Sequence, residues 1–127
     1  MSTITEKETT HLNLPPLLEK HMDFSVWLLN RVKKFHKDLR FMIGSHLAEL
    51  CLKLMDELIN AYYGCKGPAR ISALQKANVY IEQMRIKIRM SYMLGQLPTN
   101  AVLYAGRCLK EEAKMIQGWL NTENSHA

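Results

Sequence analysis

Apolar residues recur every three or four positions along four stretches of this chain, which is the spacing of one face of an α-helix. The stretches cover residues 15–35, 39–63, 69–94 and 98–120. The alternation typical of β-strands does not persist anywhere, and the sequence contains no Asn-Gly or Asp-Gly turn. The pattern therefore predicts an all-α protein built from four helices.

Glycine and proline mark the breaks between the predicted helices. Pro15 and Pro16 suit the first turn of the first helix, whereas Gly64 and Gly95 follow the second and third helices. The breaks are short, and short connections force consecutive helices to lie antiparallel. We therefore expect an up-down-up-down four-helix bundle.

The chain of 127 residues has the length of a single domain. We expect the bundle to occupy residues 15–120, with flexible tails at residues 1–14 and 121–127. Residues 1–10 are polar and lack the basic and apolar segments of a signal peptide, and no apolar run is long enough to cross a membrane. These features predict a cytoplasmic protein with no membrane partner.

One apolar stripe on each predicted helix is expected to face the core of the bundle. The four stripes are Leu17, His21, Phe24, Leu28, Val32 and Phe35; Ile43, Leu47, Leu50, Leu54, Leu58 and Ala61; Leu74, Ala77, Ile81, Met84, Ile88 and Tyr92; and Val102, Ala105, Leu109, Ala113, Ile116 and Leu120.

The second and third helices carry more apolar surface than one bundle core needs. On the third helix a second apolar stripe lies roughly 150° from the first, and on the second helix Phe41, Ala48 and Met55 widen the apolar arc. Exposed apolar patches of this kind usually mark association, so we expect a homo-oligomer. The alternative is that the wide arcs fill a broad core. The residues expected at the interface between copies are Val79, Ile86, Met90, Met93, Leu52 and Ile59.

Positive charge is concentrated in the predicted bundle. The whole chain has a net charge of +5, but residues 15–120 contain sixteen Lys and Arg against nine Asp and Glu, a net charge of +7. Such an excess favours an anionic partner. The basic corner, between the first and second helices, is Arg31, Lys33, Lys34, Lys37 and Arg40. The basic ridge, on one face of the fourth helix, is Arg107, Lys110 and Lys114.

Arg85 and Arg89 form a third basic set, one turn apart on the third helix. Arg85 falls near the core stripe, so we expect it to pair with Glu82 on the same helix, or with Asp56 or Glu57 on the second. Each basic set could be ordinary solubilising surface. The functional interpretation is that the sets neutralise nucleic-acid phosphates, an interaction that depends on salt and not on sequence.

Two tryptophans could add base stacking to such a surface. Trp27 lies off the first apolar stripe, where a role in an interface between copies and a role in nucleic-acid binding are both open. Trp119 lies at the edge of the fourth stripe, and we expect it to pack in the core.

Chemistry-bearing residues do not form a recognisable active site. His21 lies on an apolar stripe without a ligand partner one turn away, and His46 precedes Glu49 without an HExxH motif. The glutamates lack the repeated Glu-x-x-His pattern of di-iron bundles, and the three cysteines include no CxxC pair. No phosphate-binding Walker loop and no GxSxG elbow occurs. We therefore expect no catalytic residue, no metal site and no cofactor.

Three segments resemble motifs of one family of small bacterial four-helix-bundle proteins. "FHKDLRFMIGSHL" (35–47) resembles the family's "FPKxxRFxLGxxL", "MRIKIRMSYMLGQL" (84–97) resembles "LRFLLRLAxDLGxL", and "EEAKMIQGWL" (111–120) resembles "xEIGRMLGGWL". His36 replaces the proline of the first motif, and Ala113 or its neighbour replaces the first glycine of the third. In the second and third motifs the matching positions are Arg85, Arg89, Leu94, Gly95, Met115, Gly118, Trp119 and Leu120.

The family includes proteins encoded in ribosomal-RNA intervening sequences and the accessory variability determinant proteins (Avd) of diversity-generating retroelements. The resemblance implies a barrel-like homopentamer with a strongly basic surface. In the retroelement branch, which the terminal motif resembles more, it implies a non-catalytic protein that binds a reverse transcriptase, template RNA and cDNA during mutagenic cDNA synthesis. The alternative is an intervening-sequence-type oligomer, or a scaffold for an acidic protein, without a retroelement role.

Overall fold

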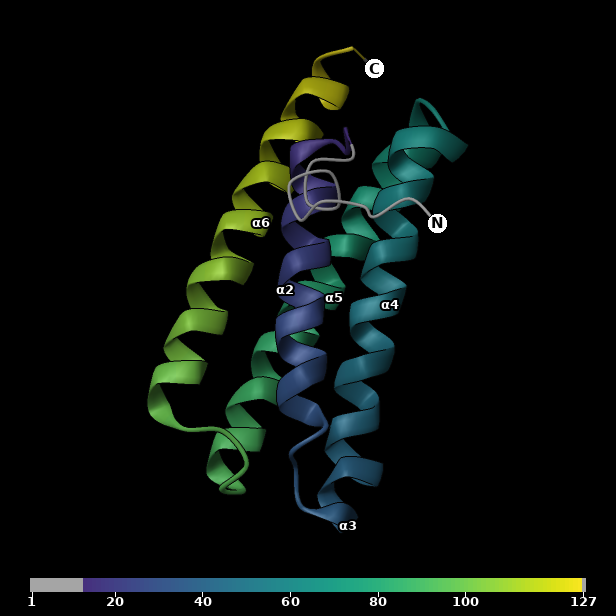
Figure 1. Cartoon of the computed structure of the whole chain (residues 1–127). Coiled ribbons are helices and arrows are strands. Elements are labelled where there is room, and N and C mark those ends of the chain that lie inside the picture. Colours follow the sequence, from purple (N-terminus) through teal and green to yellow (C-terminus); the bar gives the residue numbers. More distant parts are fainter. Residues whose placement is uncertain (1–12, 127) are drawn as a thin grey trace, which may run out of the picture.

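The computed structural model describes residues 13–126, and every element in that range is a helix (Figure 1). The four-helix bundle expected from the sequence is confirmed. Its long helices are α2 (Pro16–Val32), α4 (Ser45–Ile59), α5 (Pro68–Met93) and α6 (Thr99–Ser125). The second helix is extended at its start by α3 (Lys37–Leu39) and the π-helical turn η1 (Arg40–Gly44), and at its end by the π-helical turn η2 (Asn60–Gly64). None of the described helices is long and apolar enough to span a lipid bilayer.

Consecutive long helices alternate in direction, as the short connections predict (Figure 1). α2 packs against α4 and α6, and α5 packs against the same two helices. Each helix therefore has two neighbours and presents its outer face to solvent or to a partner.

The core lies between the four apolar stripes. Every stripe residue predicted on α2 and on the second helix is buried. On the third helix the prediction for Tyr92 is wrong, because its side chain is 43% exposed and Ser91 is buried instead. Ser91 can be buried because its hydroxyl donates to the carbonyl of Lys87 at 2.9 Å. On α6, Val102 and Ala113 are only half-buried.

Two glycines define the end of the bundle where the basic corner lies. Gly95 has a φ of +75°, a left-handed conformation that ends α5 and that residues with a Cβ rarely adopt. Gly44 lies where α2 and the second helix approach closely, since a Cβ there would be 3.0 Å from Cγ1 of Val32. The connection between α2 and α3 is also tied to the connection between α5 and α6, because the His36 amide donates to Oε1 of Gln96 at 2.6 Å.

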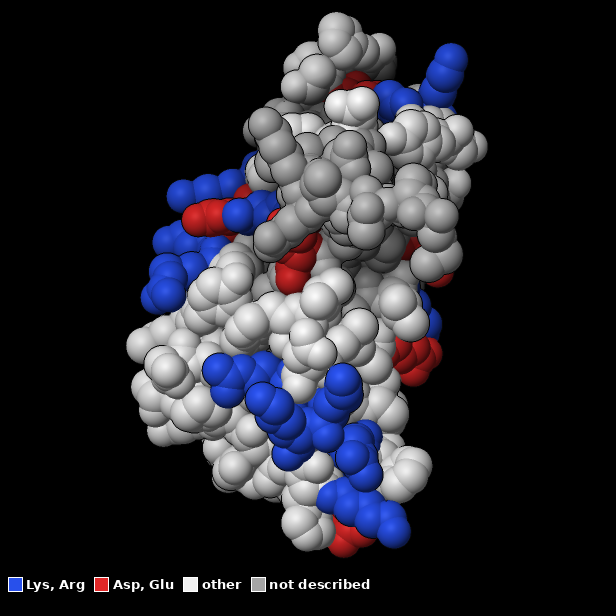
Figure 2. Space-filling view, viewed as in Figure 1, with Lys and Arg blue, Asp and Glu red and all other residues white. Residues whose placement is uncertain are grey.

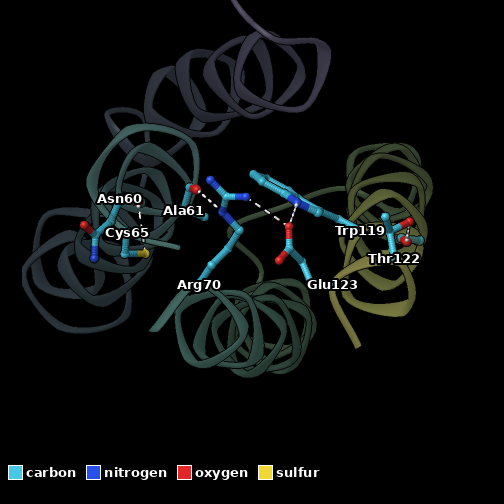
Figure 3. A network of polar contacts seen from close by, with 8 residues as sticks. Asn60, Ala61, Cys65, Arg70, Trp119, Thr122 and Glu123 are labelled. Carbon is cyan, nitrogen blue, oxygen red and sulfur yellow. Dashed lines mark hydrogen bonds and ion pairs between the residues drawn. The ribbon is translucent and has the colours of Figure 1, made fainter. Parts of the chain in front are cut away.

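The fourth helix does not end at residue 120 as the sequence predicted, since α6 continues to Ser125. Arg70 on α5 contacts this extension (Figure 3). Its Nη1 donates to Glu123 at 3.0 Å, its Nε donates to the carbonyl of Ala61 at 2.8 Å, and Nε1 of Trp119 donates to the same carboxylate at 3.2 Å. Trp119 also packs against the core, as expected. The N-terminal tail, predicted at residues 1–14, lies outside the described residues up to residue 12.

Candidate nucleic-acid interface

The basic corner is formed by the end of one helix and the start of the next. α2 ends at Val32, and the chain re-enters a helix at Lys37, so the five cations converge from two elements. Lys33, Lys34, Lys37 and Arg40 are exposed. Nη1 of Arg40 donates to the carbonyl of Lys33 at 3.3 Å, which ties the two halves of the corner together.

The charge of the basic corner is not compensated locally. Within residues 13–126, none of its five cations forms an ion pair. Asp38 is the only carboxylate between residues 31 and 40. Figure 2 shows the result as a blue group over the end of α2 and the start of the second helix. A set of unpaired, exposed cations is the arrangement that phosphate groups neutralise.

The π-helical turn η1 begins at Arg40, the last residue of the basic corner. Turns of this kind inside α-helices are frequent at functional sites. Nothing in the local sequence indicated the turn. Its exposed members Phe41 and Met42 place apolar side chains next to the corner.

The basic ridge is exposed on α6, as expected, but a carboxylate, Glu111, lies beside it. Glu111 pairs with Lys20 of α2 across the seam between the two helices. The hydrogen bond from Lys20 lowers the pKa of Glu111, and the charges of Lys114 and Arg107 lower it further. The ridge therefore offers three cations beside an ion-paired carboxylate, against the five cations of the corner.

Arg85 and Arg89 lie apart from the corner, along a groove of about 310 Å³ between α5 and α6. The expected pairing of Arg85 with Glu82 is confirmed, with 3.6 Å between Nη1 and Oε1. The expectation that Arg85 approaches the core is wrong, because its side chain is 43% exposed. Among the ion pairs of residues 13–126, no carboxylate of α4 pairs with Arg85.

The apolar residues predicted at an interface between copies are all exposed in the single chain. Their exposed fractions run from 43% for Ile59 to 76% for Met93. The alternative, that these residues fill a broad core, is therefore wrong. An apolar groove of about 430 Å³ continues this surface between the start of the second helix and the end of α5, where Met42, Met90 and Leu94 line it.

A buried polar cluster was missed by the sequence analysis. His21 and Glu112 are both fully buried, and Nδ1 of His21 lies 2.8 Å from Oε1 of Glu112. Nε2 of His21 donates to the carbonyl of Cys51 at 2.9 Å and lies 3.2 Å from the hydroxyl of Ser25. Burial raises the pKa of the Cys51 thiol to about 12. The signal for Glu112 was its position on the core face, three residues after Leu109, although its charge argued against burial.

This cluster links α2, α4 and α6, and His21, Cys51 and Glu112 are fully buried while Ser25 is 7% exposed. Within residues 13–126, no group of three or more histidine, cysteine, aspartate or glutamate side chains is arranged to hold a metal ion. The cluster is therefore a structural element of the core.

Comparisons of this chain with protein-family models, with curated proteins and with solved structures found no match. A functional proposal for this chain therefore rests on the basic corner, the exposed apolar surface and the three sequence motifs.

Proposed function

We propose that this chain is a non-catalytic accessory protein of a diversity-generating retroelement, of the Avd type, and that it binds a reverse transcriptase, template RNA and cDNA through basic surfaces. The observation that supports this most is the basic corner. Its five cations lack an ion pair within residues 13–126 and converge from two helix ends. The three family motifs supply the retroelement context, and the first of them contains part of the corner.

The proposed binding form is a homo-oligomer, and a pentamer by the family resemblance. The exposed stripe on α5, which includes Ile86, Met90 and Met93, gives each copy an apolar surface that water disfavours. Association of copies would also repeat the basic corner around the assembly. Repeated sites on one nucleic-acid strand raise overall affinity without any new contact, because the second binding event becomes intramolecular.

Titration with RNA at several salt concentrations tests the nucleic-acid part of this proposal. The variant Lys33→Glu/Lys34→Glu/Lys37→Glu removes three phosphate contacts of the corner. For single strands each contact contributes about 0.7 to the slope of log affinity against log salt, so the slope should fall by about two. Circular dichroism should show an unchanged helix content, since the three side chains are exposed.

A matched control separates a local contact from an effect of net charge. Lys53, Lys66 and Lys76 are also exposed and lie outside the corner. Changing these three to glutamate alters the net charge by the same amount as the corner variant. It should reduce the RNA affinity and the salt slope less than the corner variant does. Equal losses in the two triple variants would contradict a specific corner. Binding of acidic protein but not RNA would favour the scaffold alternative.

Co-expression with a reverse transcriptase encoded beside this gene tests the retroelement part. The proposal expects the polymerase and its template RNA to co-purify with this chain, and sequencing of the bound RNA identifies the template. Recovery of neither from a neighbourhood that contains a polymerase gene would contradict it.

A further inference from the structure

The structure brings together two aromatic residues that lie far apart in the sequence. Trp27 of α2 and Tyr104 of α6 pack with their ring centroids 4.7 Å apart and their planes tilted by 56°. Trp27 is half-buried against Phe24, with 5.8 Å between the ring centroids. Tyr104 is 39% exposed. The Trp27 ring is therefore supported by the core, and the Tyr104 ring is accessible from solvent.

This aromatic pair lies between the basic corner and the basic ridge. Trp27 precedes Arg31 of the corner by one helical turn, and the Arg31 guanidinium carbon lies 5.6 Å from the centre of the Trp27 ring. Tyr104 precedes Arg107 of the ridge by one turn. Figure 2 shows two blue groups on one face of the molecule, over the end of α2 and over α6, with largely uncharged surface between them.

We propose that the seam between α2 and α6 is a track for single-stranded nucleic acid, in which Tyr104, supported by Trp27, stacks a base between the cations of the basic corner and those of the basic ridge. The inference rests on the proposed function and adds the class of nucleic acid and the way it is held. Proteins that bind single strands combine cations along the backbone with exposed aromatic rings, and each stacked base contributes to affinity.

The length of the seam suits an extended strand. By the rise of an α-helix, Trp27 and Arg31 are about 6 Å apart along α2, and Tyr104 and Lys114 are about 15 Å apart along α6. The two helices run in opposite directions and are cross-linked beside the ridge by the Lys20 and Glu111 pair. From the aromatic pair, the corner therefore lies toward one end of the bundle and the ridge toward the other. Cations lie at both ends of the seam, with the aromatic pair between them.

The charges near Tyr104 favour a base over a phosphate at this position. A hydrogen bond with the side chain of Cys108 is the main cause that raises the pKa of the Tyr104 hydroxyl. The charge of Lys20 lowers this pKa and the charge of Asp23 of α2 raises it, but Lys20 is itself paired with Glu111. Within residues 13–126 Asp23 forms no ion pair, so it repels a phosphate there. A neutral base has no such penalty. In a duplex the bases are paired and stacked inside the helix, so they are not accessible to an aromatic side chain in this way.

Tryptophan fluorescence reports directly on this site. The chain has two tryptophans, so Trp119→Phe leaves Trp27 as the single reporter. Titration of this variant with a single-stranded RNA of unstructured sequence should quench the Trp27 signal, and a duplex of equal length should quench it less. A stacked base accounts for roughly a five-fold to 150-fold change in affinity, so Tyr104→Ala should weaken single-strand binding by about five-fold or more and leave duplex binding unchanged.

Two further variants control the experiment. Tyr104→Phe retains the ring and should retain the affinity, whereas Tyr63→Ala removes an exposed tyrosine from the other end of the bundle and should change nothing. Equal single-strand affinities for Tyr104→Ala and Tyr63→Ala would overturn the track while leaving nucleic-acid binding intact. Failure of the parent protein to bind either RNA at low salt would instead overturn the proposed function. Quenching by poly-glutamate as strong as that by RNA would assign the seam to an acidic protein and would also overturn the track.

Discussion

Removal of one member of the buried His21 and Glu112 pair should destabilise the bundle severely, whereas removal of both should not. In Glu112→Leu the imidazole of His21 remains fully buried without its carboxylate. Breaking a buried pair from one side typically costs about 3–5 kcal/mol, because an uncompensated polar group is left in the core. In His21→Leu/Glu112→Leu neither polar group remains, and replacement of a whole buried pair by apolar residues of similar volume is often neutral or stabilising.

The geometry of the pair supports the size of this difference. The two groups are close, but Nδ1 of His21 and both carboxylate oxygens of Glu112 lack a well-aligned hydrogen bond within residues 13–126. Because the two groups are close without a well-aligned hydrogen bond between them, the net contribution of the pair to stability is small, although each group would be left buried and unpaired without the other. For a domain of this size a loss of 3 kcal/mol lowers Tm by about 12 °C.

Urea denaturation followed by circular dichroism measures these free energies at one fixed protein concentration, since association also affects stability. Glu82→Leu is the matched control, because Glu82 is exposed and its change should cost less than about 0.5 kcal/mol. The reasoning is refuted if Glu112→Leu behaves like this control, or if the double variant loses as much as the single one.

Two further predictions concern the surface and the end of the bundle. Met90→Lys should lower the mass of the assembly in light scattering, because it places a charge on the exposed apolar stripe of α5. The control Gln83→Lys, at an exposed polar position of the same helix, should not lower this mass. Equal masses for the two variants would contradict the proposed interface. The hydrogen bond from Arg70 lowers the pKa of Glu123, so this carboxylate contributes stability above pH 4.5, its ordinary pKa, that is lost as the pH falls through the lower pKa of the folded state. Glu123→Gln should therefore lose less stability than the parent between pH 5 and pH 3 in thermal denaturation, and parallel profiles would exclude this role.

The helices and most of the core could be predicted from the sequence because burial of one stripe imposes a period near 3.6 residues. The same pattern failed where two adjacent positions were equally close to the core face. Ser91 and Tyr92 follow Ile88 by three and four residues, and apolarity favoured the tyrosine. The structure buries the serine because a bond to the Lys87 carbonyl satisfies its hydroxyl.

Features that depend on two helices at once could not be predicted. The burial of Glu112 requires His21 on the facing helix, and the contact between Trp27 and Tyr104 requires the register of α2 against α6. The basic corner could be predicted because its residues are close together in sequence. Its lack of compensating carboxylates could not be predicted, since that depends on side chains brought in by the fold.

Lysine footprinting on the assembled protein tests the central claim most directly. Acetylation of each exposed lysine, measured by mass spectrometry with and without saturating single-stranded RNA, reports which positions the RNA covers. The account predicts strong protection of Lys33, Lys34 and Lys37 and unchanged reactivity of Lys53 and Lys76. Unchanged reactivity across residues 33–37 in the presence of bound RNA would contradict it.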